Sequence, residues 1–279
     1  MNKQAIITHI VNWLKDYSEK SKTEGFVIGI SGGIDSALTS TLCALTGKKV
    51  ICLNMPIRQH ATEYGRGNAH IEWLKNKFPN VSNAEVNLTP IFEQMEQTFE
   101  TEIQDFLTMA NTRARLRMTT LYAYAGHHKL LVAGTGNKVE DFGIGFFTKY
   151  GDGGVDVSPI ADLMKSQVYS LAAEVGVIDS ILQARPTDGL FADSRTDEDQ
   201  IGATYDELEW AMLYLENTSN HFESTFDKLS NQLSERSSDL TDRQKVVMQI
   251  YQSRNRANKH KMEAIPVCTI PKELLMINV

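Results

Sequence analysis

The segment Ser31-Gly32-Gly33-Ile34-Asp35-Ser36 carries the residues best suited to chemistry in this chain of 279 residues. Two adjacent glycines let the backbone turn tightly and bring several N–H groups close to a ligand. The serine hydroxyls add donors, and the carboxylate of Asp35 is a hard oxygen ligand of the kind that phosphate-bound Mg²⁺ prefers. The segment lacks the lysine of a Walker A loop. It predicts a cradle for an anion or a phosphate group, and the alternative is a plain glycine turn that Asp35 caps.

Such a cradle needs a strand before it and a helix after it, and the sequence supplies both. The short apolar run Phe26–Ile30 predicts a buried strand. A helix-like run follows from Ala37 through Leu45. The positive end of that helix points at the glycine turn, so strand, turn and helix together form a phosphate-binding unit.

Apolar runs alternate with helical patterns along the chain, which predicts an α/β fold with a parallel twisted sheet flanked by helices on both faces. The predicted strands are Phe26–Ile30, Val50–Met55, Ala84–Leu88 and Leu130–Gly134. Right-handed crossovers place a ligand at the carboxyl ends of such strands. Residues 31–36 and 134–140 both fall there.

The whole chain, 1–279, is expected to form a single domain. Its predicted parts are an N-terminal helix over 1–20, an α/β core over about 24–185, a mobile acidic loop over about 188–205 and a C-terminal helical segment over about 205–279. Thr241 and Gln244 have the spacing of a capping box, which predicts that the last long helix begins there.

The amino-acid composition of the chain argues against some classes of binding partner. The net charge of −7 argues against a nucleic-acid partner held by a general basic field. No stretch approaches the ~20 apolar residues that a membrane span needs. Cys43 and Cys52 lie in apolar runs and form no C-x-x-C pair, so they are expected to be small buried hydrophobes. A reduced, cytoplasmic setting fits this cysteine usage.

Two further glycine-containing segments are weak signals when each is taken alone. Residues 134–141 read Gly-Thr-Gly-Asn-Lys-Val-Glu-Asp and follow a predicted strand, but they also fit an ordinary turn with a solvated acid. Residues 146–156 begin Phe-Phe-Thr-Lys-Tyr-Gly-Asp-Gly-Gly and also fit an exposed glycine loop. The pair His127-His128 is expected to be a polar loop and not a metal site.

The segment over residues 31–36 resembles the signature of the ATP pyrophosphatases, or PP-loop enzymes, which split ATP between its α and β phosphates. That signature also occurs in amidotransferases and tRNA sulfur-transfer enzymes, so it indicates the nucleotide chemistry but not the substrate. Together with residues 111–115, 134–140, 146–154 and 186–187, in this order, it resembles the NAD synthetases from about residue 24 to Lys261.

The resemblance implies an adenine-nucleotide alpha-hydrolase-like fold and a ligase that forms an amide C–N bond. Such a ligase converts ATP, deamido-NAD and ammonia into NAD, AMP and pyrophosphate through an NAD-adenylate intermediate. The substrate carboxylate and ammonia are the nucleophiles, so catalysis is expected to rest on positioning and charge stabilisation. The cofactor implied is Mg²⁺.

The resemblance also implies site residues. ATP would be held by Gly29, Ile30, Ser31, Gly32, Gly33, Ile34, Asp35, Ser36, Thr135, Lys165 and Thr187. Deamido-NAD would be held by Arg115, Lys149, Asp156, His260 and Lys261. The metal ligands would be Asp35 and Glu140, and the catalytic residues Asp35, Lys165 and Asp152. For Asp152, two roles stay open: the base that takes a proton from ammonium, or a residue that shapes the turn.

Arg113 and Arg117 are expected on the other side of a helix from Arg115, so Arg115 alone is assigned to the substrate. The alternative for all three arginines is a solvated basic helix face.

Three expectations concern partners and alternatives. The ATP loop begins at residue 31, which leaves no room before it for a glutaminase domain, so free ammonia or a separate protein is expected to supply nitrogen. An apolar stripe at helical spacing usually means intrachain core, whereas the resemblance implies a homodimer at these residues: Ile103, Leu107, Ala110, Ala114, Met118, Leu121, Tyr122 and Ala125. The alternatives are another PP-loop ligase, similar to GMP synthetase, and a non-catalytic nucleotide sensor.

Overall fold

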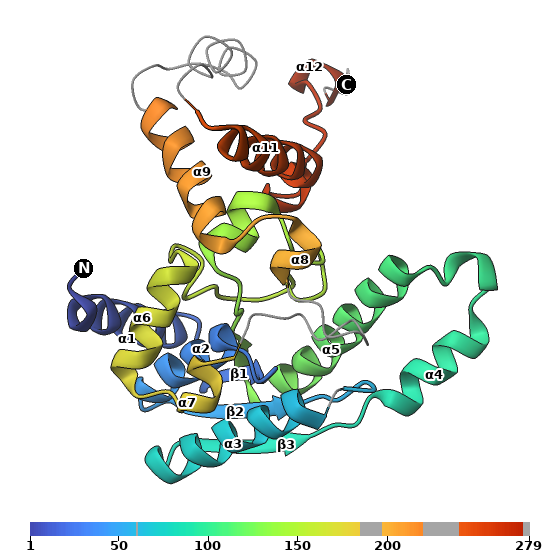
Figure 1. Cartoon of the computed structure of the whole chain (residues 1–279). Coiled ribbons are helices and arrows are strands. Elements are labelled where there is room, and N and C mark those ends of the chain that lie inside the picture. Colours follow the sequence, from blue (N-terminus) through green and yellow to red (C-terminus); the bar gives the residue numbers. More distant parts are fainter. Residues whose placement is uncertain (60, 185–196, 220–239, 276–279) are drawn as a thin grey trace.

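A computed structural model describes residues 1–59, 61–184, 197–219 and 240–275 of the chain. Four strands form a parallel sheet in the order β3-β2-β1-β4 (Figure 1). The strands are β1 (Gly25–Gly29), β2 (Lys49–Asn54), β3 (Val81–Glu85) and β4 (Leu130–Val132). The predicted α/β fold with a parallel sheet is confirmed.

Helices cover both faces of the sheet because successive strand side chains point to opposite sides. In β1, Phe26 and Ile28 belong to one core cluster, whereas Val27 belongs to another. The helices packed in the first cluster are α1 (Lys3–Lys20), α2 (Ile34–Leu45), α3 (Ala61–Lys77), α6 (Lys165–Val175) and α7 (Asp179–Leu182). The helices packed in the second are α4 (Thr89–Thr98) and α5 (Phe106–His128).

The sheet order brings the carboxyl ends of β1 and β4 side by side. β1 pairs with β4 from Gly25↔Leu130 to Val27↔Val132, and a bridge from Ala133 to Val157 extends the edge. The loop after β1 and the loop after β4 therefore start next to each other, and ligands of parallel α/β sheets bind at such a position.

The third strand begins three residues earlier than predicted. β3 covers Val81–Glu85, whereas the apolar run suggested Ala84–Leu88. β3 is an edge strand with exposed Ser82 and Asn83, so its pairing with β2 does not show as an apolar pattern. The end of the apolar run lies beyond the strand, where Val86 N–H donates to Asn54 O at 2.9 Å.

The predicted acidic loop is wrong over its second half. Asp197–Ile201 forms helix α8, and Tyr205–Ser219 forms α9. Acidic residues in the first turn of a helix interact favourably with its dipole, so the same composition suits a helix start. The first half of that loop lies outside the described residues. His127-His128 ends α5 and is not a loop.

A C-terminal helical unit packs in a cluster of its own above the strand ends. It contains α9 and α11 (Asp242–Met262), together with the π-helix η2 (Val139–Ile144). The predicted capping box opens α11, since Thr241 N–H donates to Gln244 Oε1 at 2.9 Å and Gln244 N–H donates to Thr241 Oγ1 at 3.2 Å. Asn258 Nδ2 of α11 donates to Ile144 O of η2 at 2.9 Å, which fastens this unit to the loop after β4.

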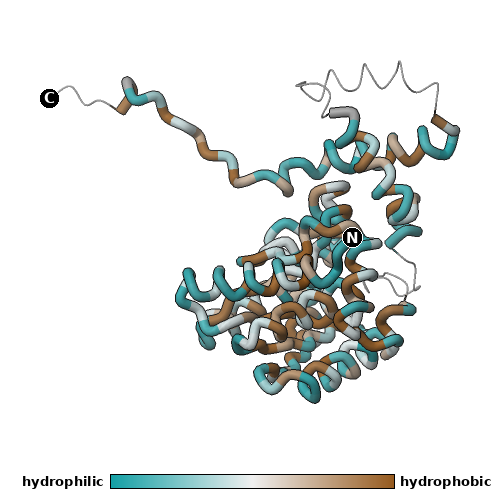
Figure 2. The backbone as a smooth tube through the Cα atoms, turned by 90° about the vertical axis from the view of Figure 1, so that its left-hand side faces the viewer, coloured by the Kyte–Doolittle hydropathy of each residue, from teal (hydrophilic) through white to brown (hydrophobic). Residues whose placement is uncertain are grey.

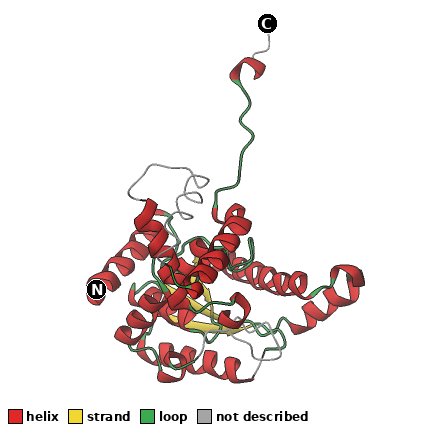
Figure 3. Ribbon diagram, turned by 45° about the horizontal axis from the view of Figure 1, so that its top comes forward, coloured by secondary structure: helices red, strands yellow, loops and turns green. Residues whose placement is uncertain are grey.

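Two segments lie at the periphery. The short helix η1 (Thr101–Ile103) joins α4 to α5. After α11 the chain runs from Glu263 to α12 (Lys272–Leu275) and extends away from the body (Figures 2 and 3). Ile265 and Val267 of this tail are exposed. Across the described ranges, none of the helices has both the length and the hydropathy that a membrane span requires.

The buried histidine of α3 predicts an acid-sensitive stability. His70 is completely buried, and its Nε2 lies 2.9 Å from Ser40 Oγ of α2. Burial lowers the pKa of His70 to about 4, so the unfolded chain, with a histidine pKa of about 6.5, binds more protons between these values. The free energy of unfolding should fall by up to about 3 kcal/mol as the pH drops through this window.

Urea unfolding of the wild type and of His70→Gln between pH 7 and pH 4 measures this effect. The His70→Gln variant should show a shallower loss of stability with acid. His127→Gln, at an exposed position on α5, is the matched control and should follow the wild type. Equal pH slopes for the wild type and His70→Gln would contradict the prediction.

Candidate functional site

The loop between β1 and α2 forms the predicted cradle. Gly32 has φ +84°, and a Cβ there would lie 2.6 Å from Glu63 O, so only glycine fits. Ser31 Oγ accepts from Gly33 N–H at 3.1 Å, and Ser36 Oγ donates to Gly33 O at 3.0 Å. Helix α2 begins at Ile34, so its amino end faces this turn. The geometry is that of an anion site at a helix amino end.

A buried charged cluster stands beside the cradle. Lys165, the first residue of α6, is 3% exposed. Its Nζ donates to Asp35 Oδ2 at 2.7 Å and to Glu140 Oε1 at 2.9 Å. Asn137 Nδ2 donates to Asp35 Oδ1 at 3.1 Å. Helix α2, the π-helix η2 and helix α6 thus bring together the three residues that the sequence assigned to ATP and metal, and the loop after β4 adds Asn137.

The cluster carries more negative than positive charge. Burial alone would lower the pKa of Lys165, but the carboxylates of Asp35 and Glu140 raise it above its usual value, so the ammonium is retained. Burial would raise the pKa of Glu140, but Lys165 and the Tyr205 hydroxyl hold it below the usual range. Burial and the charge of Glu140 raise the pKa of Asp35. One lysine serves two carboxylates, which leaves the site suited to a further cation.

The donor set fits Mg²⁺ bound together with a phosphate group. Asp35 and Glu140 both form an ion pair with the Lys165 ammonium, so the two carboxylate groups lie close enough together to share one small cation. Among the residues that the structure describes, no group of three or more His, Cys, Asp or Glu side chains is placed to hold a metal, so a cation at this site would have two protein carboxylates. Mg²⁺ usually takes one or two carboxylates and completes its octahedron with water and phosphate oxygens.

Sequence reasoning missed two members of this cluster. Asn137 lies within a segment that the sequence singled out, so its position beside Glu140 was a usable signal. Tyr205, at the start of α9, donates from its hydroxyl to Glu140 Oε1 at 2.6 Å. No local pattern points to Tyr205, because only the packing of the C-terminal unit brings it to the site.

Four of the five residues assigned to deamido-NAD form a second group. Arg115 Nη2 donates to Lys149 O at 3.4 Å, and Lys149 Nζ donates to His260 O at 2.6 Å. Lys261 Nζ donates to Phe147 O at 2.6 Å and also to Gly145 O. Helix α5, the loop over 145–154 and the end of α11 therefore meet here.

The neighbours of Arg115 on α5 have other roles, and for them a solvated basic face is wrong. Arg117 Nε donates to Met55 O at 3.2 Å, and burial lowers the pKa of Arg117 to about 10. The guanidinium of Arg113 lies 4.8 Å from the centre of the Phe92 ring. Arg115 is exposed, so the separation predicted from helical spacing is confirmed.

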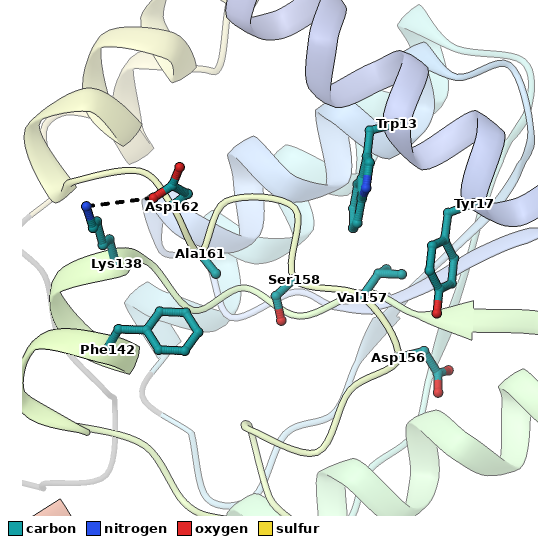
Figure 4. A pocket seen from close by; sticks show the side chains of 9 residues that line it. All are labelled: Trp13, Tyr17, Lys138, Phe142, Asp156, Val157, Ser158, Ala161 and Asp162. Carbon is teal, nitrogen blue, oxygen red and sulfur yellow. Dashed lines mark ion pairs between the residues drawn. The ribbon is translucent and has the colours of Figure 1, made fainter. Parts of the chain in front are cut away.

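Asp156, the fifth residue, lies apart from that group on the β4 edge. Its Oδ2 accepts from Val132 N–H at 2.8 Å and its Oδ1 from Tyr122 OH at 3.0 Å. It lines a cavity of about 550 Å³ with Trp13, Tyr17 and Phe142 (Figure 4). The other lining residues are Lys138, Val157, Ser158, Ala161 and Asp162. Sequence reasoning missed Trp13 and Tyr17, the two aromatic residues that α1 contributes to this cavity.

Two further carboxylates lie above the sheet: Asp152 on the loop over 145–154 and Asp141 in the π-helix η2. Asp152 Oδ1 accepts from Thr148 N–H at 2.9 Å, a contact that the turn-shaping alternative requires. Asp152 keeps an exposed surface, yet desolvation by the surrounding protein raises its pKa. Burial and the charges of Glu140 and Asp152 raise the pKa of Asp141 to about 8. Thr135 lies on the loop after β4, and Thr187 lies outside the described residues.

Comparison with known proteins places this site in a family context. Residues 6–262 match the model of the NAD synthase family. The NH(3)-dependent NAD(+) synthetase of Mycoplasma genitalium is 40% identical over 206 residues, which are 73% of this chain and 80% of that protein. The NH(3)-dependent NAD(+) synthetase of Methanosarcina mazei is 36% identical, over 74% of this chain and 80% of that protein.

Solved structures agree on the fold. The structure of NMN synthetase from Francisella tularensis has a TM-score of 0.78 and 28% identity, and the match covers 97% of this chain and 100% of that one. The NH3-dependent NAD synthetase from Campylobacter jejuni, in complex with the nitrate ion, has a TM-score of 0.74 at 24% identity, over 96% of this chain and 100% of that one.

Proposed function

The chain belongs to the NAD synthase family, and from this premise we propose that it is an ammonia-dependent NAD synthetase. The reaction takes ATP, deamido-NAD and ammonia to NAD, AMP and pyrophosphate. The observation that carries the proposal is the buried Asp35–Lys165–Glu140 cluster beside the glycine cradle. The retained charges argue against a sensor that binds nucleotide without turnover.

In the first step the nicotinate carboxylate attacks the α-phosphorus of ATP, and the bond to pyrophosphate breaks. The cradle's N–H groups and the amino end of α2 hold the phosphates. Lys165 stands next to the two carboxylates beside the cradle, and its ammonium is a cation placed to offset the charge that develops on the α-phosphate. Asp35 and Glu140 would hold Mg²⁺, which when bound screens the charge on the leaving pyrophosphate.

In the second step ammonia attacks the activated carbonyl carbon and the bond to AMP breaks. Ammonium has no lone pair, so a base must first take its proton. We assign this role to Asp152, whose loop carries Gly151, Gly153 and Gly154 and lies against α5. Desolvation raises the pKa of Asp152, and a carboxylate with a raised pKa is a stronger proton acceptor once it is ionised.

Two groups of residues support a dinucleotide as the substrate that carries the carboxylate. Arg115, Lys149 and the end of α11 supply positive charge for its diphosphate. The cavity that Asp156 lines supplies the aromatic rings of Trp13 and Tyr17 (Figure 4). Aromatic rings are suited to stack on a nucleobase.

One specific observation favours a second candidate. The NMN synthetase of Francisella tularensis matches nearly the whole of both chains. An enzyme that makes NMN by the same chemistry would amidate the corresponding mononucleotide acid, nicotinate mononucleotide. That substrate lacks the adenosine half and would leave the cavity with Trp13 and Tyr17 unused.

One experiment separates these functions. The purified chain is incubated with ATP, Mg²⁺ and ammonium, and with deamido-NAD or nicotinate mononucleotide, and the products are separated by chromatography. We expect NAD, AMP and pyrophosphate in equal amounts with deamido-NAD, and little product when glutamine replaces ammonium. Preference for the mononucleotide would support NMN synthesis instead. ADP and phosphate as products, or efficient use of glutamine, would contradict the proposal.

We also propose a cytoplasmic homodimer. Buried free Cys43 and Cys52 suit a reducing compartment. The predicted apolar stripe is divided: Ala110 and Ala125 are buried, Leu121 packs against the core, and Leu107 is 67% exposed. Ile103 and Tyr122 are exposed as well. Helices α4 and α5 project together from the sheet (Figure 1). These exposed residues are the part of the stripe available to a second copy.

Leu107→Asp is therefore expected to convert the dimer to a monomer, because a buried unpaired charge opposes association. Light scattering at micromolar protein measures the mass. Ile265→Asp, at a similarly exposed apolar position of the tail (66%), is the control and should remain a dimer. A fully active wild-type monomer would refute the homodimer.

A further inference from the structure

Tyr205 links the C-terminal helical unit to the charged cluster. It is the first residue of α9 and is 5% exposed. Its hydroxyl donates to Glu140 Oε1 at 2.6 Å, and its ring centre lies 4.7 Å from Lys165 Nζ. A single side chain thus contacts both the carboxylate and the ammonium, through a hydrogen bond and a cation–π contact.

The surroundings of Tyr205 hold it in place. Its backbone N–H donates to Glu198 Oε1 at 2.9 Å, and its hydroxyl also lies 3.3 Å from Asp197 Oδ2. Its ring packs in the buried cluster that contains Val139 of the π-helix and Leu208 of α9. Packing and neighbouring polar contacts fix a side chain well enough to orient a second residue.

The two donors meet on one oxygen of Glu140. Oε1 accepts from both Lys165 Nζ and the Tyr205 hydroxyl. A carboxylate oxygen with two such donors has both lone-pair directions occupied, so the plane of the carboxylate is fixed and Oε2 is turned toward a defined direction. Residues that hydrogen-bond a metal-binding carboxylate orient it and tune its affinity.

We propose that Tyr205 is a positioning residue for the adenylation step: it orients the Glu140 carboxylate and confines the Lys165 ammonium beside the nucleotide cradle. Through it, the packing of α9 against the π-helix η2 and helix α6 determines the geometry of the site. The inference rests on the proposed function, since it concerns the residues that would hold ATP and its cation.

The test compares Tyr205→Phe with Tyr251→Phe. Tyr251 lies in the same buried cluster and is also 5% exposed, so it is a matched loss of one buried hydroxyl. Two quantities are measured: the affinity for Mn²⁺ in the presence of an ATP analogue with a non-cleavable α–β bridge, by electron paramagnetic resonance, and the rate of pyrophosphate exchange into ATP with deamido-NAD. Tyr205→Phe should lower both by about ten- to a hundredfold, whereas Tyr251→Phe should leave both near wild type.

A double-mutant cycle with Glu140→Gln, read as Mn²⁺ affinity, separates positioning from a general structural effect. If Tyr205 acts through Glu140, adding Tyr205→Phe to Glu140→Gln should cost little more, because coupled residues are not additive. Additive losses, or equal results for Tyr205→Phe and Tyr251→Phe, would overturn the inference. A wild type that binds Mn²⁺ and the analogue but exchanges no pyrophosphate would count against the proposed function, while the binding comparison still decides the role of Tyr205.

Discussion

Asp35→Ala and Glu140→Ala should each reduce adenylation by at least about a thousandfold while the protein stays folded. Each removes one oxygen ligand of the cation, and several kcal/mol of charge stabilisation at about 1.4 kcal/mol per factor of ten give a loss of this size. The fold should survive because two carboxylates share one lysine: when either is removed, Lys165 keeps the other as its partner.

Lys165→Met gives the contrasting result. It leaves two buried carboxylates without their cation, so it should lower the free energy of unfolding by about 3–5 kcal/mol as well as activity. Exchange of labelled pyrophosphate into ATP measures adenylation, and urea unfolding measures stability. Near wild-type exchange by either alanine variant would remove Asp35 or Glu140 from the metal site. A Lys165→Met variant as stable as the wild type would show that the charges are not coupled.

Asp152→Asn is expected to slow the reaction of ammonia with the adenylate by about a hundredfold or more, the usual contribution of a general base. Adenylation itself should stay close to wild type. Because an asparagine oxygen can still accept from Thr148 N–H, this variant keeps the turn and removes only the proton acceptor. The rate of the variant should recover partly as the pH rises, since free ammonia then accumulates and no base is needed.

Single-turnover mixing of preformed adenylate with ammonium, followed over a pH series, measures this step. In the wild type the rate should rise as the pH passes the raised pKa of Asp152, because only the ionised carboxylate accepts a proton. Asp152→Ala is the companion variant, since it loses both the base and the turn contact. If the asparagine variant matches the wild type and only the alanine variant fails, Asp152 shapes the turn and the base lies elsewhere.

The sheet was largely predictable because its central strands are buried on both faces. β1 and β2 show as continuous apolar runs, and their bounds agree with the predictions to within one residue. The bounds of the edge strand β3 were not predicted correctly, because an edge strand with one exposed face has no continuous apolar run. Its pairing depends on backbone contacts with β2. The acidic stretch after residue 196 was misread for a related reason: α8 and α9 are helices whose stability comes from packing against α11 and η2.

The candidate site was predictable where motif residues lie close to strand ends. Asp35 and Glu140 follow β1 and β4, and the pairing of those strands brings them to one lysine. Tyr205 and the aromatic pair on α1 were not predictable in this way. Their contacts depend on how separate helices dock on the sheet, and sequence spacing carries no information about such docking.

The π-helix over Val139–Ile144 has a consequence for how the chain tolerates changes in length. A π-turn holds one residue more than an α-turn, so deleting a single residue there would restore α-helical winding. Each residue in an α-helix is rotated by about 100° from the last. Glu140 would then swing away from Lys165, or the backbone carbonyls that Asn255, Asn258 and Lys261 contact would shift instead. The length of this segment is therefore as constrained as its composition, although loops flank it on both sides. We expect an insertion or deletion of one residue here to disrupt the site.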